Sequence, residues 1–153
     1  MNRYLRCLGA MMMMITVACN DPPASPGQAL LNAEDRAILE KVKAKEQERT
    51  ALSASPSKYI LAGAWNAYDK GIVNTYTQAT DIEFDNQSGF DVSDIEGSIT
   101  YLNKAGQAMA TVPFKAVGNL DAGKKSRLKV EATEISGGAD RARIIVERVR
   151  VHG

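Results

Sequence analysis

From about residue 56 to the end of the chain, hydrophobic and polar residues alternate in short stretches. Residues 125–132, for example, place Leu128 and Val130 on one parity and Arg127 and Lys129 on the other. Successive side chains of a β-strand point to opposite faces of a sheet, so this period of two predicts strands with one buried face. Clusters of glycine, asparagine, aspartate and serine separate the stretches and predict turns.

These stretches predict six or seven strands with no helix between them. The six long strands are expected at residues 58–68, 72–85, 90–102, 107–117, 125–132 and 141–151. Parallel strands need crossover connections of a dozen or more residues, so the short connections here predict antiparallel pairing. Strands at this spacing favour an antiparallel β-sandwich that covers residues 56–153.

Two irregularities are expected within the strands. Val92 lies on one parity and Ile95 and Ile99 on the other, and a β-bulge at residues 93–94 would bring all three to one face. Pro113 has no backbone N–H to donate to a neighbouring strand. It therefore predicts that its strand lies at an edge of the sheet.

A helical pattern precedes the strands. Residues 29–52 contain no proline or glycine, and residues 25–28 supply a serine cap, a proline at the first helical position and a glutamine. Ten of the sixteen residues 34–49 are charged, and Lys45 and Arg49 interrupt the apolar repeat that a coiled coil needs. We therefore expect a charged, solvated spacer helix with a short patch that rests on the domain or on the membrane surface. A coiled-coil or partner-binding segment is the alternative.

The first residues carry a separate pattern. Residues 1–6 hold two basic side chains and no acid, residues 7–17 form an apolar run, and Ala18 precedes Cys19. A basic segment, an apolar segment and a small residue before a cleavage point are typical of a secretory signal peptide. We expect residues 1–18 to be removed.

Residues 16–19 (Thr-Val-Ala-Cys) resemble the lipobox of bacterial lipoproteins, which usually begins with leucine. The resemblance implies cleavage before Cys19 and a diacylglyceryl group on its thiol, and several acyl chains give stable membrane anchoring. Asn20 stands where an aspartate would favour retention in the inner membrane of enteric bacteria, so the resemblance favours the outer membrane, facing the periplasm. Residues 19–28, which include three prolines, predict an extended tether.

Turn signals in the strand region resemble a known domain family. Residues 84–88 (Phe-Asp-Asn-Gln-Ser), 99–106 (Ile-Thr-Tyr-Leu-Asn-Lys-Ala-Gly) and 120–124 (Leu-Asp-Ala-Gly-Lys) resemble the FxLYD-like group of immunoglobulin-like envelope domains. Ala122 replaces the usual proline of that group, and Asn103 replaces its aspartate. The resemblance implies an immunoglobulin-like β-sandwich that acts as a non-catalytic extracytoplasmic module.

Charge and residue types narrow the function. Without residues 1–18 the chain keeps 17 basic and 18 acidic residues, so it has no overall basic field to attract nucleic acid. General acid–base and nucleophilic catalysis commonly use a histidine or cysteine beside a carboxylate. The single histidine, His152, is next to the C-terminal residue, and Cys19 would be acylated. We therefore expect neither an enzyme nor a cofactor, and no nucleic-acid partner.

Acidic residues around one predicted hairpin are candidates for a calcium site, because oxygen ligands suit that ion. They are Asp81, Glu83, Asp85, Asp91, Asp94 and Glu96. Their spacing does not fit the calcium-loop pattern of helix–loop–helix proteins. The alternative is a solvated strand face whose acids pair across strands with Arg127, Lys129, Arg141 or Arg143.

Aromatic residues near the first predicted hairpin offer a second candidate site. Tyr59, Trp65, Tyr68 and Tyr76 could form a flat platform for a ligand. The alternative is that they pack in the core at a sheet edge, and this is the interpretation that we favour for Trp65.

Together these observations predict a membrane-anchored envelope lipoprotein. Its β domain would be a non-catalytic protein-interaction or structural module with a partner that the sequence does not identify. Exposed strand edges suit the capture of a partner by strand addition. The alternative is an extracytoplasmic carrier of a small ligand or lipid, which needs an apolar pocket of roughly 300–1,000 Å³.

Overall fold

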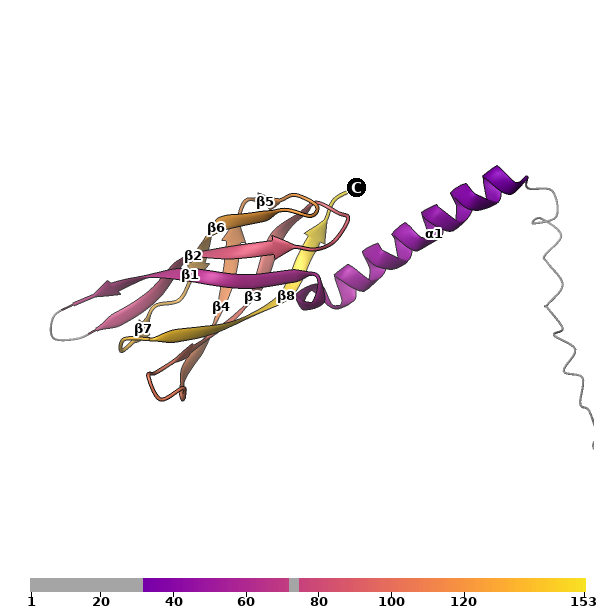
Figure 1. Ribbon diagram of the computed structural model, residues 1–153. Coiled ribbons are helices and arrows are strands. Elements are labelled where there is room, and N and C mark those ends of the chain that lie inside the picture. The colour runs from indigo at the N-terminus through magenta and orange to yellow at the C-terminus, as the bar shows by residue number, and fades with distance from the viewer. Residues whose placement is uncertain (1–31, 72–74) are drawn as a thin grey trace, which may run out of the picture. The chain divides into compact units, whose positions relative to one another are not determined.

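The computed structural model describes residues 32–71 and 75–153 of the chain. This part contains one α-helix, a short 3-10 helix and eight strands, which are arranged as in Figure 1. The helix α1 covers Ala33–Ala54, and the 3-10 helix η2 covers Pro56–Lys58. The strands are β1 (Ile60–Lys70), β2 (Tyr76–Asn86), β3 (Val92–Leu102), β4 (Ala108–Val117), β5 (Asn119–Leu120), β6 (Lys125–Ala132), β7 (Ile135–Ser136) and β8 (Arg141–Val151).

The helix begins at Ala33 because Asn32 caps it. The Oδ1 atom of Asn32 accepts a hydrogen bond from the backbone N–H of Asp35 at 2.8 Å, and this bond satisfies one N–H that a helix start leaves unpaired. The predicted helix of residues 29–52 therefore differs from the observed one at Asn32, which precedes the helical turns. The predicted start signal at residues 25–28 lies outside the described residues.

The strands form one antiparallel sheet. Its hydrogen-bonded order is β1-β2-β6-β4-β3, with β8 on the other side of β3, and with the short strands β7 and β5 extending the pairing of β2 and β3. The sheet curls, so that β1 and β2 lie in front of β3 and β4 in Figure 1, and β1 comes into contact with β8. The prediction of a mainly β, antiparallel domain after one helix is confirmed. The count of six or seven strands omitted the two-residue strands β5 and β7.

The core lies on the concave side of the curled sheet and follows the predicted alternation along most strands. Its largest fully buried hydrophobic side chains are Tyr101, Phe84, Leu52, Ile60, Ile82, Ile95, Ile99, Leu120 and Val92. The rings of Phe84 and Phe114 stack with their centroids 6.1 Å apart. Leu128 and Val130 are buried, as predicted, whereas Arg127 and Lys129 on the other parity are exposed.

The predicted bulge at residues 93–94 is confirmed. The register of β3 against β8 shifts between Ser93 and Glu96, and Asp94 adopts φ +46°, a left-handed conformation that is uncommon outside glycine. The extra residue changes the parity of the strand. As a result, Val92 and Ile95 both point into the core and are 0% exposed.

Thr80, Ile82 and Phe84 lie on one parity in the sequence, and this alternation predicts that Thr80 points inward. That prediction is wrong, because Thr80 is exposed. The buried, inward-facing residues of β2 in this stretch are Ala79 and Ile82, and Thr80 is not among them. The cause is a shift in the β1–β2 register between Asn66 and Ala67, which pair with this part of β2. Asn66 pairs with Asp81 and Ala67 pairs with Ala79, so Thr80 is an extra residue of β2 itself. This bulge reverses the parity that the local sequence suggests.

Pro113 lies on a strand that is not an edge of the sheet, because β4 is placed between β6 and β3. The prediction of an edge strand was therefore wrong for β4 as a whole. However, pairing with β6 begins only at Phe114, opposite Ala132, whereas Pro113 already pairs with Ser98 of β3. Proline thus occupies a stretch of β4 with a strand ladder on one side, where a missing N–H costs least.

Candidate functional site

Cys19, the predicted lipidation site, lies outside the described residues, as do the signal peptide 1–18 and the tether 19–28. Within the described part of the chain, no helix is both long enough and apolar enough to cross a membrane.

The acidic residues of the candidate calcium site separate onto different strands. On β2, the carboxylate of Asp81 lies 3.5 Å from Arg127 Nη1, and that of Glu83 lies 3.7 Å from Lys125 Nζ. Lys129 is the register partner of Asp81 on β6. Pairing of opposite charges across two strands is the alternative that the sequence offered for these acids.

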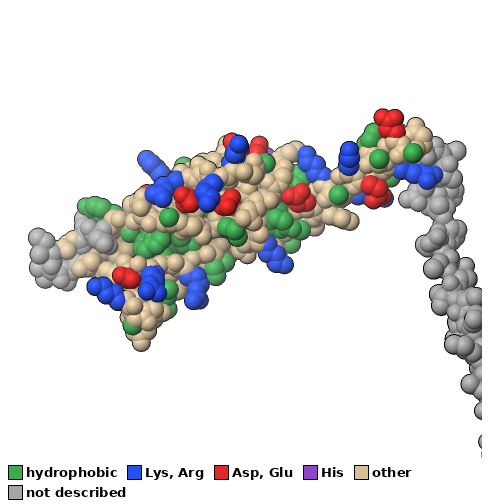
Figure 2. All heavy atoms as spheres, viewed as in Figure 1, with side chains coloured by type: hydrophobic (Ala, Val, Ile, Leu, Met, Phe, Trp, Pro, Cys, Tyr) green, Lys and Arg blue, Asp and Glu red, His purple; other side chains and the backbone are tan. Residues whose placement is uncertain are grey.

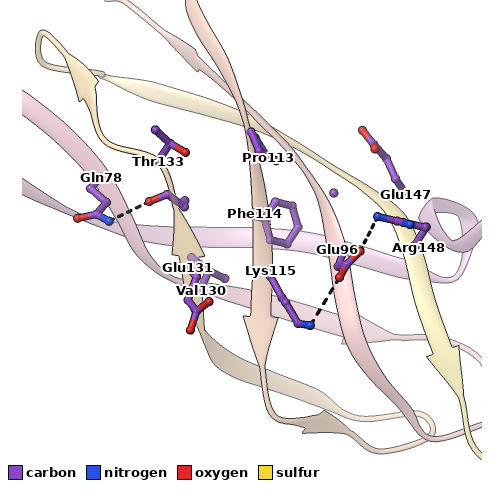
Figure 3. Close-up of a pocket in the computed structure, with 12 residues that line it drawn as sticks. Gln78, Glu96, Pro113, Phe114, Lys115, Val130, Glu131, Thr133, Glu147 and Arg148 are labelled. Carbon is purple, nitrogen blue, oxygen red and sulfur yellow. Dashed lines mark hydrogen bonds and ion pairs between the residues drawn. The ribbon is translucent and has the colours of Figure 1, made fainter.

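The acids of β3 face other cations. Arg148 Nη2 lies 2.7 Å from Glu96 Oε2, and Arg150 Nε lies 3.0 Å from Asp94 Oδ2. Lys115 Nζ on β4 lies 3.7 Å from Glu96 and 3.9 Å from Asp94, so it joins the two pairs. Figure 3 shows the contacts of Glu96 with Lys115 and Arg148. The β3 bulge thus carries an exposed network of three cations and two acids.

The two remaining acids of the group take part in local structure. Asp85 is the register partner of Lys125, and Asp91 Oδ1 accepts a hydrogen bond from the N–H of Ala122 at 2.8 Å. Within residues 32–71 and 75–153, no three His, Cys, Asp or Glu side chains are placed to hold a metal ion. Four of the six acids therefore form ion pairs with basic side chains, and Asp91 binds a backbone N–H.

His152 makes a contact that sequence reasoning missed. Its Nε2 atom lies 2.7 Å from Ser93 Oγ, at an exposed position, and its backbone N–H donates to the carbonyl of Asp91 at 2.9 Å. A serine beside an imidazole is one part of a nucleophilic site. Among the described residues, however, no carboxylate binds the other ring nitrogen. The contact fastens the end of β8 to the β3 bulge.

The aromatic residues do not form a common platform. Trp65 is half-buried and packs edge-on against Tyr101, with ring centroids 5.7 Å apart, so its predicted core position is confirmed in part. Tyr68 is exposed, and Tyr59 is half-buried against the core. The hydroxyl of Tyr101 accepts a hydrogen bond from the N–H of Ala79 at 3.0 Å. Burial raises the pKa of Tyr101, and this hydrogen bond opposes part of the rise.

A groove of about 620 Å³ opens on the outer face of the sheet, next to the place where β4 and β6 separate (Figure 3). Side chains from five strands line it: Gln78, Glu96, Pro113, Lys115, Glu131 and Arg148. Gln78 Nε2 donates to the carbonyl of Ala132 at 2.8 Å and bridges β2 to the end of β6. Because charged side chains dominate its rim, the groove suits a polar ligand better than a lipid.

The edge strand β8 presents an alternating surface. Four arginines are exposed, namely Arg141 and Arg143 before the register shift at residues 146–148, and Arg148 and Arg150 after it. Ile145 lies among them and is 45% exposed, whereas Ile144 and Val146 on the other parity are half-buried and buried. This arrangement can pair with an extended backbone and attract anionic side chains.

In comparisons with protein-family models, curated proteins and solved structures, the chain matches none.

Proposed function

We propose that this chain is a bacterial envelope lipoprotein, anchored through acylated Cys19 in the outer membrane and facing the periplasm. The lipobox-like residues 16–19, after a basic and an apolar segment, support the anchor. The β domain would act as a non-catalytic protein-interaction or structural module. Its antiparallel strands and its FxLYD-like turns support assignment to the immunoglobulin-like β-sandwiches.

The observation that carries the interaction role is the pairing of β8 with a single strand, β3, in the described part of the sheet. A strand at a sheet edge has a row of backbone N–H and C=O groups available to another chain. Main-chain hydrogen bonds to such an edge give affinity, and side chains on alternate positions give specificity. A module of this kind needs no catalytic group and no cofactor.

The groove beside β4 favours a second candidate function, the carriage of a small ligand. Its volume of about 620 Å³ lies within the usual range for ligand sites. The charged rim formed by Glu96, Lys115, Glu131 and Arg148 favours a polar ligand. We rank this candidate second because the groove is an open surface feature, whereas ligand sites usually enclose most of the ligand.

The anchor is tested by labelling bacterial cells that express the chain with an alkyne-tagged fatty acid. We expect label on the wild-type chain and on Cys7→Ser, because Cys7 lies in the segment that is removed. Cys19→Ser should carry no label and should accumulate as precursor or leave the membrane fraction. Equal labelling of Cys19→Ser and the wild type would contradict the anchor.

The module is tested in the same cells by site-specific photocrosslinking from exposed positions of the β domain. A single crosslinked protein, recovered again when the partner itself is the bait, would support an interaction role. Thermal shifts of the full chain in detergent with panels of small polar metabolites and of fatty acids test the carrier. Marked stabilisation by either panel, without a crosslinked partner, would replace the proposal with the carrier function.

A further inference from the structure

We infer that the free edge of β8 binds an extended segment of a protein partner in which acidic residues alternate with aliphatic residues. The inference rests on the proposed function as a protein-interaction module. It adds which edge of the sheet is used and the chemistry of the segment that binds there.

The first half of β8 offers the most regular free edge in the described sheet. Residues 141–146 pair with residues 97–102 of β3 without a register shift. The ladder that the other outer strand, β1, forms with β2 shifts register twice, between Ala62 and Trp65 and between Asn66 and Ala67. β1 and η2 contact β8, but they form no strand ladder with it in the described part of the chain. A guest strand therefore finds a continuous row of backbone groups on β8.

The outer face of this segment carries positive charge that its sheet neighbours do not neutralise. Arg143 is exposed, pairs in register with Thr100 and forms no ion pair within residues 32–71 and 75–153. Arg141 pairs in register with Leu102, and its side chain is 68% exposed although Asp140 lies 3.6 Å from it. Carboxylates on a bound strand of the partner, opposite these arginines, would supply the negative charges that neutralise them.

The second half of β8 differs in this respect. Arg148 and Arg150 are held by Glu96 and Asp94 of β3, at 2.7 and 3.0 Å. Figure 2 shows basic side chains along the edge of the domain where Figure 1 places the start of β8. The unpaired positive charge of β8 is therefore concentrated on its first half.

The inward-facing residues of β8 explain why the bound segment should also carry aliphatic side chains. Ala142 and Ile144 are half-buried against the core, and Val146 is 3% exposed. A guest strand that pairs with β8 would place alternate side chains beside these residues, where aliphatic groups extend the core. Ile145, which follows Arg143 on the same parity and is 45% exposed, offers an apolar contact beside the charged positions.

Charge also distinguishes a foreign segment from a second copy of this chain. Two β8 strands paired through their free edges would oppose arginines with arginines, since Glu147 is the single acid of the strand. Like charges directly opposite each other destabilise strand pairs. The edge is therefore protected against self-pairing and open to an acidic partner.

The test uses the full chain in detergent and a short synthetic peptide in which valine and glutamate alternate. Two control peptides have lysine in place of glutamate, or N-methylated amides on the edge that would meet β8. We expect the acidic peptide to bind at least about tenfold more tightly than either control. Amide exchange should slow at residues 141–146. Equal binding of the three peptides, or protection elsewhere, would overturn the inference.

Two variants sharpen the test. Arg143→Glu should weaken binding of the acidic peptide by about tenfold or more. Lys124→Glu makes the same charge change in the turn before β6, so it should leave binding unchanged. An equal loss of peptide binding in both variants would mean that general electrostatic attraction drives binding. Dimerisation through β8 without peptide would mean that a second copy of this chain occupies the edge. Either result overturns the inference. Photocrosslinking in cells distinguishes this inference from the proposed function. A partner captured from position 131 but not from position 143 would refute binding at the β8 edge and would still support the proposed interaction module.

Discussion

The carboxylate of Glu48, on α1, accepts a hydrogen bond from the backbone N–H of Gly89 at 2.8 Å and joins the helix to the turn between β2 and β3. On the same side of the helix, Lys45 Nζ lies 5.5 Å from the centre of the Phe90 ring, and Leu52 is 0% exposed. The last turns of α1 therefore pack on the β domain. The predicted solvated spacer describes the first half of the helix better than the second.

Replacing Glu48 with alanine should lower the free energy of unfolding by about 1 kcal/mol, because one partly exposed, charge-assisted hydrogen bond is lost. Chemical denaturation followed by tryptophan fluorescence measures the change. Glu46→Ala is the matched control, since Glu46 is exposed on the same helix and its side chain makes no described hydrogen bond or ion pair. Equal stability losses in the two variants would mean that the contact with Gly89 contributes nothing.

This contact also indicates why the sequence predicted the helix only in part. Lys45 interrupts an apolar repeat, and on local pattern alone a lysine there predicts a solvated face. Its partner Phe90 and the partner of Glu48 are more than forty residues away. Contacts at that separation depend on the path of the whole chain, so no periodicity within the helix reveals them.

The strands were easier to predict than their neighbours in the sheet. Alternation and turn residues located residues 125–132 and 141–151 at the bounds that the structure has, because both signals are local. The order of strands is not local. The sequence therefore did not show that β4 lies between two other strands or that β8 is an edge strand. It also did not show that Ser93 contacts His152, which is 59 residues away. The candidate surface depends on these facts.

Asn86 joins two turns, the one between β2 and β3 and the one between β5 and β6, and should be among the most sensitive positions of the domain. It is 0% exposed. Its Nδ2 donates to the carbonyls of Phe90, Leu120 and Asp121 at 2.8–3.3 Å, and its Oδ1 accepts from Ser88. Asn86→Ala should lower the free energy of unfolding by about 2–3 kcal/mol, because buried partners are left unsatisfied.

Calorimetry of Asn86→Ala and of a matched control measures this effect. Gln87→Ala alters the exposed neighbour and should change the stability by less than about 0.5 kcal/mol. Asn86→Asp should also destabilise the domain, because a carboxylate cannot donate to the three carbonyls. A stable Asn86→Asp variant would show that the donor bonds are dispensable.

Gly97 should tolerate no side chain. A Cβ atom at this position would overlap the carbonyl oxygen of Ile145 on β8 and approach the ring of Phe114 to 2.9 Å. Gly97→Ala should therefore force β3 and β8 apart and cost about 1–3 kcal/mol or more. Gly63→Ala is the control, since the nearest atom there is the flexible carboxylate end of Glu83 at 3.4 Å. Similar Tm values for the two variants would contradict this explanation.

Tyr101 should make the domain sensitive to alkaline pH. Burial raises the pKa of its phenol above the usual value of 10.0, against a smaller lowering by the N–H of Ala79. The unfolded chain therefore releases this proton at a lower pH than the folded chain does. The corresponding stability is fully present below about pH 10 and is lost as the pH rises through the pKa of the folded state.

Urea denaturation at neutral pH and at several values above pH 10 tests this dependence. Tyr101→Phe should lose about 1 kcal/mol at neutral pH, because the N–H of Ala79 loses its acceptor, and should then lose less than the wild type on alkalinisation. Tyr68→Phe removes an exposed phenol (57% exposed) and should retain the alkaline dependence of the wild type. If Tyr101→Phe loses stability above pH 10 as steeply as the wild type, another group is responsible for the alkaline transition.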